Sequence, residues 1–180
     1  TGLIAEQYPK GFTAASVTHD DPSFLLALAV ATNRRVLARS AGISGQLPGH
    51  ELQLGEDFVA VQTDVDGLRH ETAARVRADG DLFNVEIGGR AYPIRFERPL
   101  RAVAMHGSVA GKAFSAQIER LALAYRVIHQ GARVEVRVLS PRAAELNALM
   151  PFKAPPDLSK FLLSPMPGLL VDVAVQAGQT

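Results

Sequence analysis

Cysteine and tryptophan are both missing from this 180-residue sequence, and neither sign of charge dominates it. Without cysteine the chain can form no disulfide, thiolate nucleophile or cysteine-ligated zinc site, which fits a reducing compartment. Its 19 basic and 18 acidic side chains give a formal net charge of +1. The sequence therefore lacks the excess of positive charge that is typical of proteins that bind nucleic acid or an anionic membrane surface. The longest apolar runs are also far shorter than the roughly 20 residues that span a bilayer. Since 47% of the residues are hydrophobic, the composition indicates a globular domain.

Residue patterns for catalysis or metal binding are likewise missing. The five histidines are scattered, with no H-E-x-x-H, and are interpreted as surface or strand residues. Residues 64–67 and 79–81 resemble calcium loops but lack the closing glutamate. Residues 107–112 lack the spacing of a phosphate loop, and Ser140 precedes a proline, which favours helix capping over nucleophilic catalysis. The prediction is therefore no catalytic residue, no metal ligand and no cofactor bound within the chain.

Residues 21–40, D-P-S-F-L-L-A-L-A-V-A-T-N-R-R-V-L-A-R-S, predict one long helix. Asp21 is a natural N-cap and Pro22 suits the first helical position, although Thr18 is an alternative cap. Gly42 is the predicted C-terminal stop.

This helix has no single hydrophobic face, because every residue from Phe24 to Ala31 is apolar. A helix that is apolar all round has to be enclosed by lipid or by protein. The run is too short for lipid, and Asn33 and the arginines after it interrupt it. The rest of the chain is therefore expected to wrap the helix.

From Phe58 to Leu139 the hydrophobic period changes to two, which is typical of half-buried strands. Short glycine-containing turns separate these stretches and favour antiparallel neighbours. About eight strands are predicted, at residues 58–63, 69–77, 82–87, 92–97, 100–106, 114–118, 121–127 and 134–138. The predicted fold class is α+β, an antiparallel barrel of roughly eight strands wrapped around one long central helix. Because a helix is about 10 Å wide, such a barrel has to be wide, splayed or incomplete.

Residues 40–57, between the helix and the first strand, form a candidate docking loop. Their four glycines and Pro48 predict irregular structure, yet the segment carries aliphatic side chains that a merely solvated loop does not need. The candidate partner-binding residues are Ile43, Leu47, Pro48, His50, Leu52 and Leu54.

The C-terminal part of the chain changes character after the predicted barrel. Ser140 and Pro141 open a short helix by the cap-then-proline rule, and residues 151–163, with two adjacent prolines, predict a semi-stiff linker. Residues 164–180 then begin a new strand with nothing to pair against.

The first residues of that last segment carry the most specific motif. S-P-M-P-G, followed by alternating valines, resembles the opening strand of biotinyl carrier domains, which are related to lipoyl domains. The motif residues are Ser164, Pro165, Met166, Pro167 and Gly168. In that family biotin is attached to a lysine in a motif like E-A-M-K-M, which this sequence does not contain. The resemblance therefore places the biotinyl lysine beyond Thr180.

Three further stretches resemble the α subunit of biotin-dependent acyl-CoA carboxylases, most closely the propionyl-CoA carboxylases. They are T-G-L-I-A-E-Q-Y-P-K-G-F at 1–12, F-N-V-E-I-G-G at 83–89 and R-A-A-E-L-N-A-L-M at 142–150. The resemblance implies four parts: 1–17, leading in from an upstream biotin carboxylase domain; 18–150, a helix-in-barrel assembly domain; 151–163, a linker; and 164–180, the truncated start of the carrier domain.

In that family the middle domain is non-catalytic and docks the α subunit onto the carboxyltransferase β subunit, in an α6β6-type hetero-oligomer. The implied enzyme carboxylates propionyl-CoA to methylmalonyl-CoA with ATP, Mg, bicarbonate and covalent biotin, and ATP and Mg bind in the upstream domain. A bacterial cytoplasm is favoured over the mitochondrial matrix. Two alternatives stay open: the same role in a methylcrotonyl-CoA or other acyl-CoA carboxylase, and a lipocalin-like barrel carrying a small apolar ligand. A free-standing hydrolase has the least support.

Overall fold

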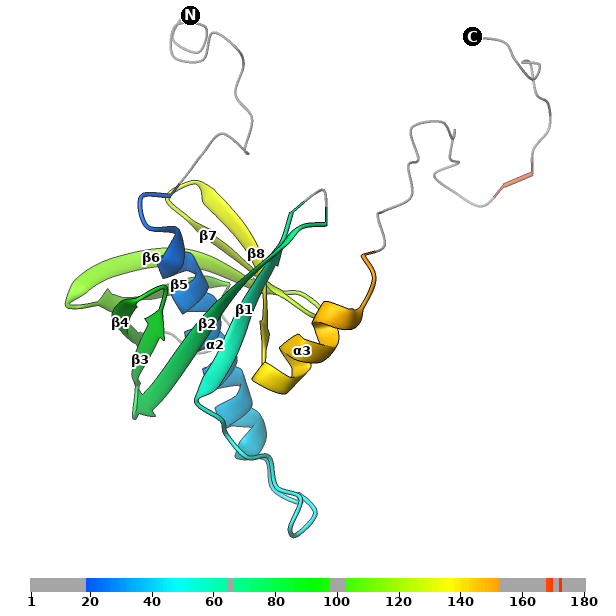
Figure 1. The fold of residues 1–180 in the computed structure, drawn as a ribbon. Helices are drawn as coiled ribbons and strands as arrows, with labels where there is room; N and C mark the ends of the chain where they lie inside the picture. The colour runs from blue at the N-terminus through cyan, green and yellow to red at the C-terminus, as the bar shows by residue number, and fades with distance from the viewer. Residues whose placement is uncertain (1–18, 65–66, 98–102, 153–167, 170–171, 173–180) are drawn as a thin grey trace, which may run out of the picture.

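The computed structural model describes residues 19–64, 67–97, 103–152, 168–169 and 172, and within them one helix runs through a closed barrel of eight strands (Figure 1). Every strand pairs antiparallel with its neighbour in the chain, and β8 pairs with β1. The elements are α2 (Pro22–Ala41), β1 (Asp57–Thr63), β2 (Arg69–Asp79), β3 (Leu82–Ile87), β4 (Arg90–Phe96), β5 (Ala104–Val109), β6 (Lys112–Arg120), β7 (Tyr125–His129), β8 (Ala132–Leu139) and α3 (Pro141–Leu149). The predicted fold class is confirmed.

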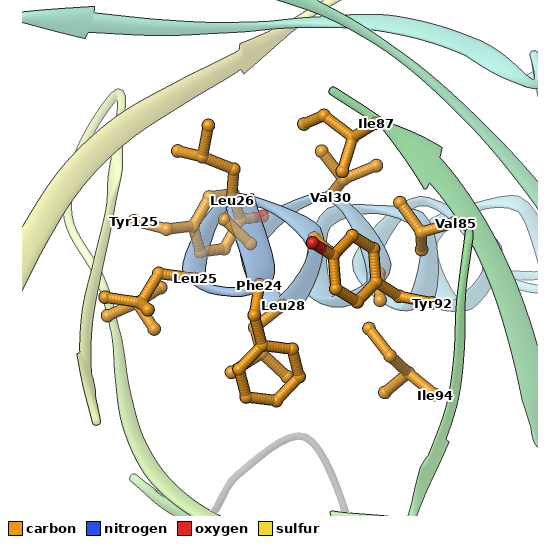
Figure 2. Close-up of a cluster of buried hydrophobic side chains, with 14 of the residues drawn as sticks. Phe24, Leu25, Leu26, Leu28, Val30, Val85, Ile87, Tyr92, Ile94 and Tyr125 are labelled. Carbon is orange, nitrogen blue, oxygen red and sulfur yellow. The ribbon is translucent and has the colours of Figure 1, made fainter. Parts of the chain in front are cut away.

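The apolar half of α2 is buried on all sides, as predicted. From Phe24 to Thr32 no residue is more than 6% exposed. Figure 2 shows Phe24, Leu25 and Leu26 pointing to different sides of the helix, and the side chains of the surrounding strands face them. The helix and the inward residues of the barrel therefore form one hydrophobic core.

The barrel is closed, which excludes the last of the three predicted alternatives, a wide, a splayed or an incomplete barrel. Two of its joins are nevertheless short, because β4–β5 and β1–β8 have three registered residue pairs each. Small side chains at Ala27, Ala29 and Ala31 are completely buried and let the strands approach the helix closely. α2 lies closer to β2, β3, β7 and β8 than to β5 and β6. The helix is thus off-centre in the barrel.

Aromatic rings fill part of the wider side. Phe24 of α2 meets Phe114 of β6 edge-on at 5.5 Å, and Phe114 in turn meets Phe96 of β4 at 6.2 Å. Gly107 of β5 makes room for this packing, since a Cβ there would lie 2.2 Å from the carbonyl oxygen of Arg95 and 3.0 Å from the Phe114 ring. A glycine in this strand interior therefore marks a close backbone approach.

The start of α2 differs from the prediction in its chemistry. Asp21 is the N-cap residue, but its side chain makes no capping hydrogen bond. Both carboxylate oxygens instead lie 3.0 Å from the hydroxyl of Tyr92, which donates to them, and Arg90 lies 3.1 Å away. The carboxylate ties the helix to β4, which satisfies the charge better than a local cap does. Gly42 is the C-cap, as predicted, and Thr18 lies outside the described residues.

The second helix, α3, lies against the outside of the barrel across the short β1–β8 join (Figure 1). Ser140 caps it as predicted, accepting a hydrogen bond from the Ala143 backbone N–H at 3.3 Å. Its far end is held by two arginines from the barrel: Arg137 donates to the Asn147 side chain at 3.1 Å, and Arg69 donates to the backbone carbonyls of Asn147 and Met150. α3 therefore packs across one of the two joins at which the strands have only three registered residue pairs.

Two strand predictions are wrong in their bounds. A strand was predicted at residues 100–106, but β5 begins at Ala104 and ends at Val109. Residues 98–102 lie outside the described part of the chain. The stretch predicted at 121–127 becomes a strand only from Tyr125 onward. Residues 121–124 form a hairpin connection. Leu123 is 78% exposed there, although the alternating pattern predicted that its side chain would be buried in a strand.

Candidate functional site

The docking loop extends beyond one end of the barrel, where α2 leaves it, and returns to start β1 (cyan in Figure 1). Its large aliphatic side chains are strongly exposed: Leu47 is 67%, Ile43 is 62% and Leu52 is 41% exposed. Pro48 and His50 are also exposed, and Leu54 is partly buried. The six predicted partner-binding residues therefore lie on one short segment, five of them open to solvent. Apolar side chains gathered on a projecting loop are typical of a protein interaction site.

The side chain of Gln46 organises this loop. It donates to the carbonyl of Ala41 at 2.6 Å and to that of Ile43 at 3.1 Å, and its oxygen accepts from the Leu52 backbone N–H at 2.8 Å. A turn that includes the His50 N–H bond to the Leu47 carbonyl, at 3.0 Å, forms the tip. The two arms of the loop are thus bridged, which lowers the conformational entropy that a partner has to remove on binding.

Ion pairs fix the point where the loop rejoins the barrel. Arg75 donates to Asp57 at 2.7 Å, and Arg77 donates to Glu56 at 3.3 Å. The hydrogen bond from Arg75 holds the pKa of the Asp57 carboxyl below its ordinary value. Both pairs are solvent-exposed, so their effect is to set the direction of the loop more than to stabilise the domain.

The C-terminal half of α2 emerges gradually toward the loop. Tyr125 donates to the Asn33 side chain at 3.2 Å, and the Arg35 guanidinium lies 4.5 Å from the centre of the Phe96 ring. Burial lowers the pKa of Arg35, and Asp81 opposes that shift. These two contacts give Asn33 and Arg35 partners at the barrel rim, where the helix passes from a dry interior into solvent.

The described residues contain no group of three or more histidine, aspartate or glutamate side chains suited to hold a metal ion.

One pair of histidines makes a contact that the sequence did not predict. His19, just before α2, lies 2.7 Å from His129 of β7, nitrogen to nitrogen, and also accepts from the Asp21 backbone N–H at 2.9 Å. With 110 positions between the two rings, no local pattern points to this contact. The pair joins the start of the helix to the barrel wall.

The carrier-domain motif falls largely outside the described residues. Ser164, Pro165, Met166 and Pro167 are not described, and Gly168 is exposed and outside any helix or strand.

In the described part of the chain, no helix combines the length and apolarity needed to cross a bilayer. The barrel interior is occupied by the side chains of α2, which counts against the lipocalin-like carrier, since such a carrier needs interior space for its ligand.

Comparison with known proteins identifies a family and several relatives of this chain. The family described as "Propionyl-coenzyme A carboxylase BT domain" matches residues 25–153, well over half of the chain. The propionyl-CoA carboxylase alpha chain of Ruegeria pomeroyi is 33% identical over 179 residues, which is 99% of this chain and 26% of the relative. The mitochondrial alpha chains of Caenorhabditis briggsae and Homo sapiens are 31% and 28% identical, again over 99% of this chain and 26% and 24% of their own lengths.

The chain thus spans about a quarter of the length of the curated relatives it matches. The matched residues take in most of the central helix, the docking loop, all eight strands and α3. On this basis, the chain belongs to the propionyl-coenzyme A carboxylase BT domain family.

Proposed function

We propose that this chain is the non-catalytic assembly domain of a propionyl-CoA carboxylase α subunit, and that its docking loop attaches that subunit to the carboxyltransferase β subunit. The observation that carries the proposal is the ordered loop with exposed aliphatic side chains, on a domain whose core is complete without them. Membership of the BT domain family supports the enzyme class.

In the whole enzyme, biotin is carboxylated with ATP, Mg and bicarbonate, and the carboxyl group then passes to propionyl-CoA to give methylmalonyl-CoA. Both catalytic centres, and the biotinyl lysine, belong to other parts of the complex. The contribution of this domain is geometric. By anchoring one subunit on the other, it holds the biotin tether within reach of both centres and raises the effective concentration of biotin at each.

The loop is suited to anchoring for two physical reasons. Complete burial of a leucine side chain against a partner is worth about 1.5–3 kcal/mol, and Leu47 and Leu52 retain 67% and 41% exposure from which to gain it. In addition, the Gln46 bridge already restrains the two arms of the loop, so less of this gain is lost to ordering.

The proposal is tested with the full-length α subunit and its β subunit. Replacing Leu47 and Leu52 by aspartate places two charges on the loop without touching the core, and co-purification of the two subunits should be lost. Leu68→Asp is the matched control, since Leu68 is 60% exposed in the β1–β2 connection at the opposite end of the barrel. Circular dichroism melting shows whether each variant remains folded. Normal assembly of the double variant, or of a subunit that lacks residues 47–54, would contradict the proposal.

The acyl substrate is part of the same proposal. We propose propionyl-CoA because the relatives reported above are all propionyl-CoA carboxylase alpha chains. Carboxylation assays on the assembled enzyme, with propionyl-CoA and methylcrotonyl-CoA compared at equal concentration, distinguish the two candidates. We further propose an α6β6-type assembly, to be measured by analytical ultracentrifugation. A location in a bacterial cytoplasm is favoured by the higher identity of the Ruegeria relative.

A further inference from the structure

A groove lies beside the docking loop, between the C-terminal half of α2 and the rim of β5, β6 and β7. Its volume is about 560 Å³. Ile43, the first aliphatic residue of the docking loop, forms part of its wall. The groove and the loop therefore form one continuous surface at the same end of the barrel. The lining residues are Thr32, Val36, Arg39, Ser40, Ile43, Val103, Met105, Ile118, Glu119, Arg120 and Tyr125.

The off-centre position of α2 accounts for the groove. The helix lies against β2, β3, β7 and β8, which leaves a wider space toward β5 and β6. Near the start of the helix, the edge-to-face rings of Phe24, Phe96 and Phe114 fill that space. Toward the end of the helix, Val36 and Arg39 line the groove, no phenylalanine is among the lining residues, and Tyr125 is the one aromatic residue there.

The groove combines an apolar floor with a positive rim. Val36, Met105 and Ile118 supply aliphatic and thioether surface, and Val103 at the edge is 52% exposed. Arg39 and Arg120 are exposed and form no ion pair within the described part of the chain. The one acid in the lining, Glu119, is already held by Arg126 at 2.9 Å. An incoming negative charge therefore meets two arginines and no competing free carboxylate in the lining.

We infer that this groove is a second part of the docking surface and that it receives a segment of the carboxyltransferase subunit in which an apolar side chain neighbours a carboxylate. The apolar side chain covers the floor, and the carboxylate lies at the rim beside Arg39 and Arg120. Charge complementarity and continuity with the loop through Ile43 favour this occupant. The inference rests on the proposed docking function and adds the chemistry of the partner segment.

Charge reversal at the rim tests the electrostatic half of the inference. In the full-length α subunit, Arg39→Glu and Arg120→Glu should each weaken binding of the β subunit about tenfold at low salt, and the deficit should shrink at high salt. Lys112→Glu is the matched control, because Lys112 begins the strand that Arg120 ends and so lies at the opposite end of the barrel. That control should change the dissociation constant less than about twofold. Biolayer interferometry at two ionic strengths gives both quantities.

Val103→Asp tests the apolar half, with Leu68→Asp as the control for an exposed aliphatic residue elsewhere. Binding should weaken about tenfold for the first variant and stay unchanged for the second. If the groove variants bind like the wild type while the loop variant at Leu47 and Leu52 does not, the groove inference is overturned and the docking proposal stands. If the loop variant also binds normally, both fail. If the groove variants instead alter self-association of the α subunit alone, measured by sedimentation, the occupant is a second copy and the inference is wrong.

Discussion

The enclosure of α2 predicts that truncating its buried side chains is costly on every side of the helix. Leu26 and Leu28 are separated by about 200° around the helix axis and so point in nearly opposite directions. They are 6% and 0% exposed. In an ordinary surface helix one of two such residues faces water, and its truncation changes stability by less than about 0.5 kcal/mol. Here Leu26→Ala and Leu28→Ala should both be strongly destabilising.

The magnitude follows from how little the surroundings can relax. Leucine-to-alanine changes in cores cost about 2–5 kcal/mol, with the upper values where the cavity cannot collapse. The strand wall around α2 is a closed ladder held by hydrogen bonds, so its strands cannot move inward independently. We therefore expect about 4 kcal/mol for Leu28→Ala and about 3–4 kcal/mol for Leu26→Ala, at the rim of the same core.

Urea denaturation followed by circular dichroism measures both losses. With a slope of about 2 kcal/mol per molar, a loss of 4 kcal/mol lowers the midpoint by about 2 M. Leu123→Ala, at a position 78% exposed, is the control and should leave the midpoint unchanged. If either Leu26→Ala or Leu28→Ala costs less than about 1 kcal/mol, one side of the helix is not packed and the account of the fold is wrong.

Three further predictions concern contacts of the barrel. Gly107→Ala should destabilise the domain by about 1–3 kcal/mol in the same urea assay, because its Cβ would meet a carbonyl oxygen at 2.2 Å; an unchanged midpoint would show that the strands can separate there. Tyr92→Phe removes the donor to the Asp21 carboxylate and should cost about 1–2 kcal/mol, and a neutral result would assign that carboxylate to Arg90 alone. Burial and the neighbouring His19 lower the pKa of His129, so the folded state favours the neutral ring and stability should fall as the pH drops below about 6.5. His129→Phe should lose less stability between about pH 7.5 and about pH 5.5 than the wild type does, and an equal loss would contradict this assignment.

The sequence predicts the architecture well because its signals are periodic and local. Eight consecutive apolar residues from Phe24 to Ala31 leave no polar stripe, so enclosure is the only arrangement that keeps the helix dry. Alternation with short glycine turns then indicates antiparallel strands, and Gln130-Gly131 forms such a turn with both residues at positive φ. Together these two patterns lead to a barrel around a helix. The division of the chain into four parts remains a prediction.

What the sequence does not show depends on contacts between distant segments. The Asp21 carboxylate binds Tyr92 and Arg90 because barrel closure brings β4 beside the helix start, whereas local propensity predicts a cap. The His19–His129 contact depends on the same closure. For the docking loop, five of the six residues selected from the sequence are exposed, and Leu54 is partly buried; their role in docking remains a prediction. The bridging role of Gln46 was missed, since a glutamine in a loop has no distinctive local signal.

The position of the enclosed helix in the chain has a consequence for biosynthesis. α2 precedes all eight strands, so during translation its apolar surface leaves the ribosome before any part of its cover exists. The last strand, β8, closes the barrel only after the other seven strands have been synthesised. Until then, the apolar surface of α2 is exposed and can associate with the same surface of other nascent chains. Fragments that stop short of β8 should therefore aggregate or be held by chaperones, and productive folding of this domain has to wait for its C-terminal end.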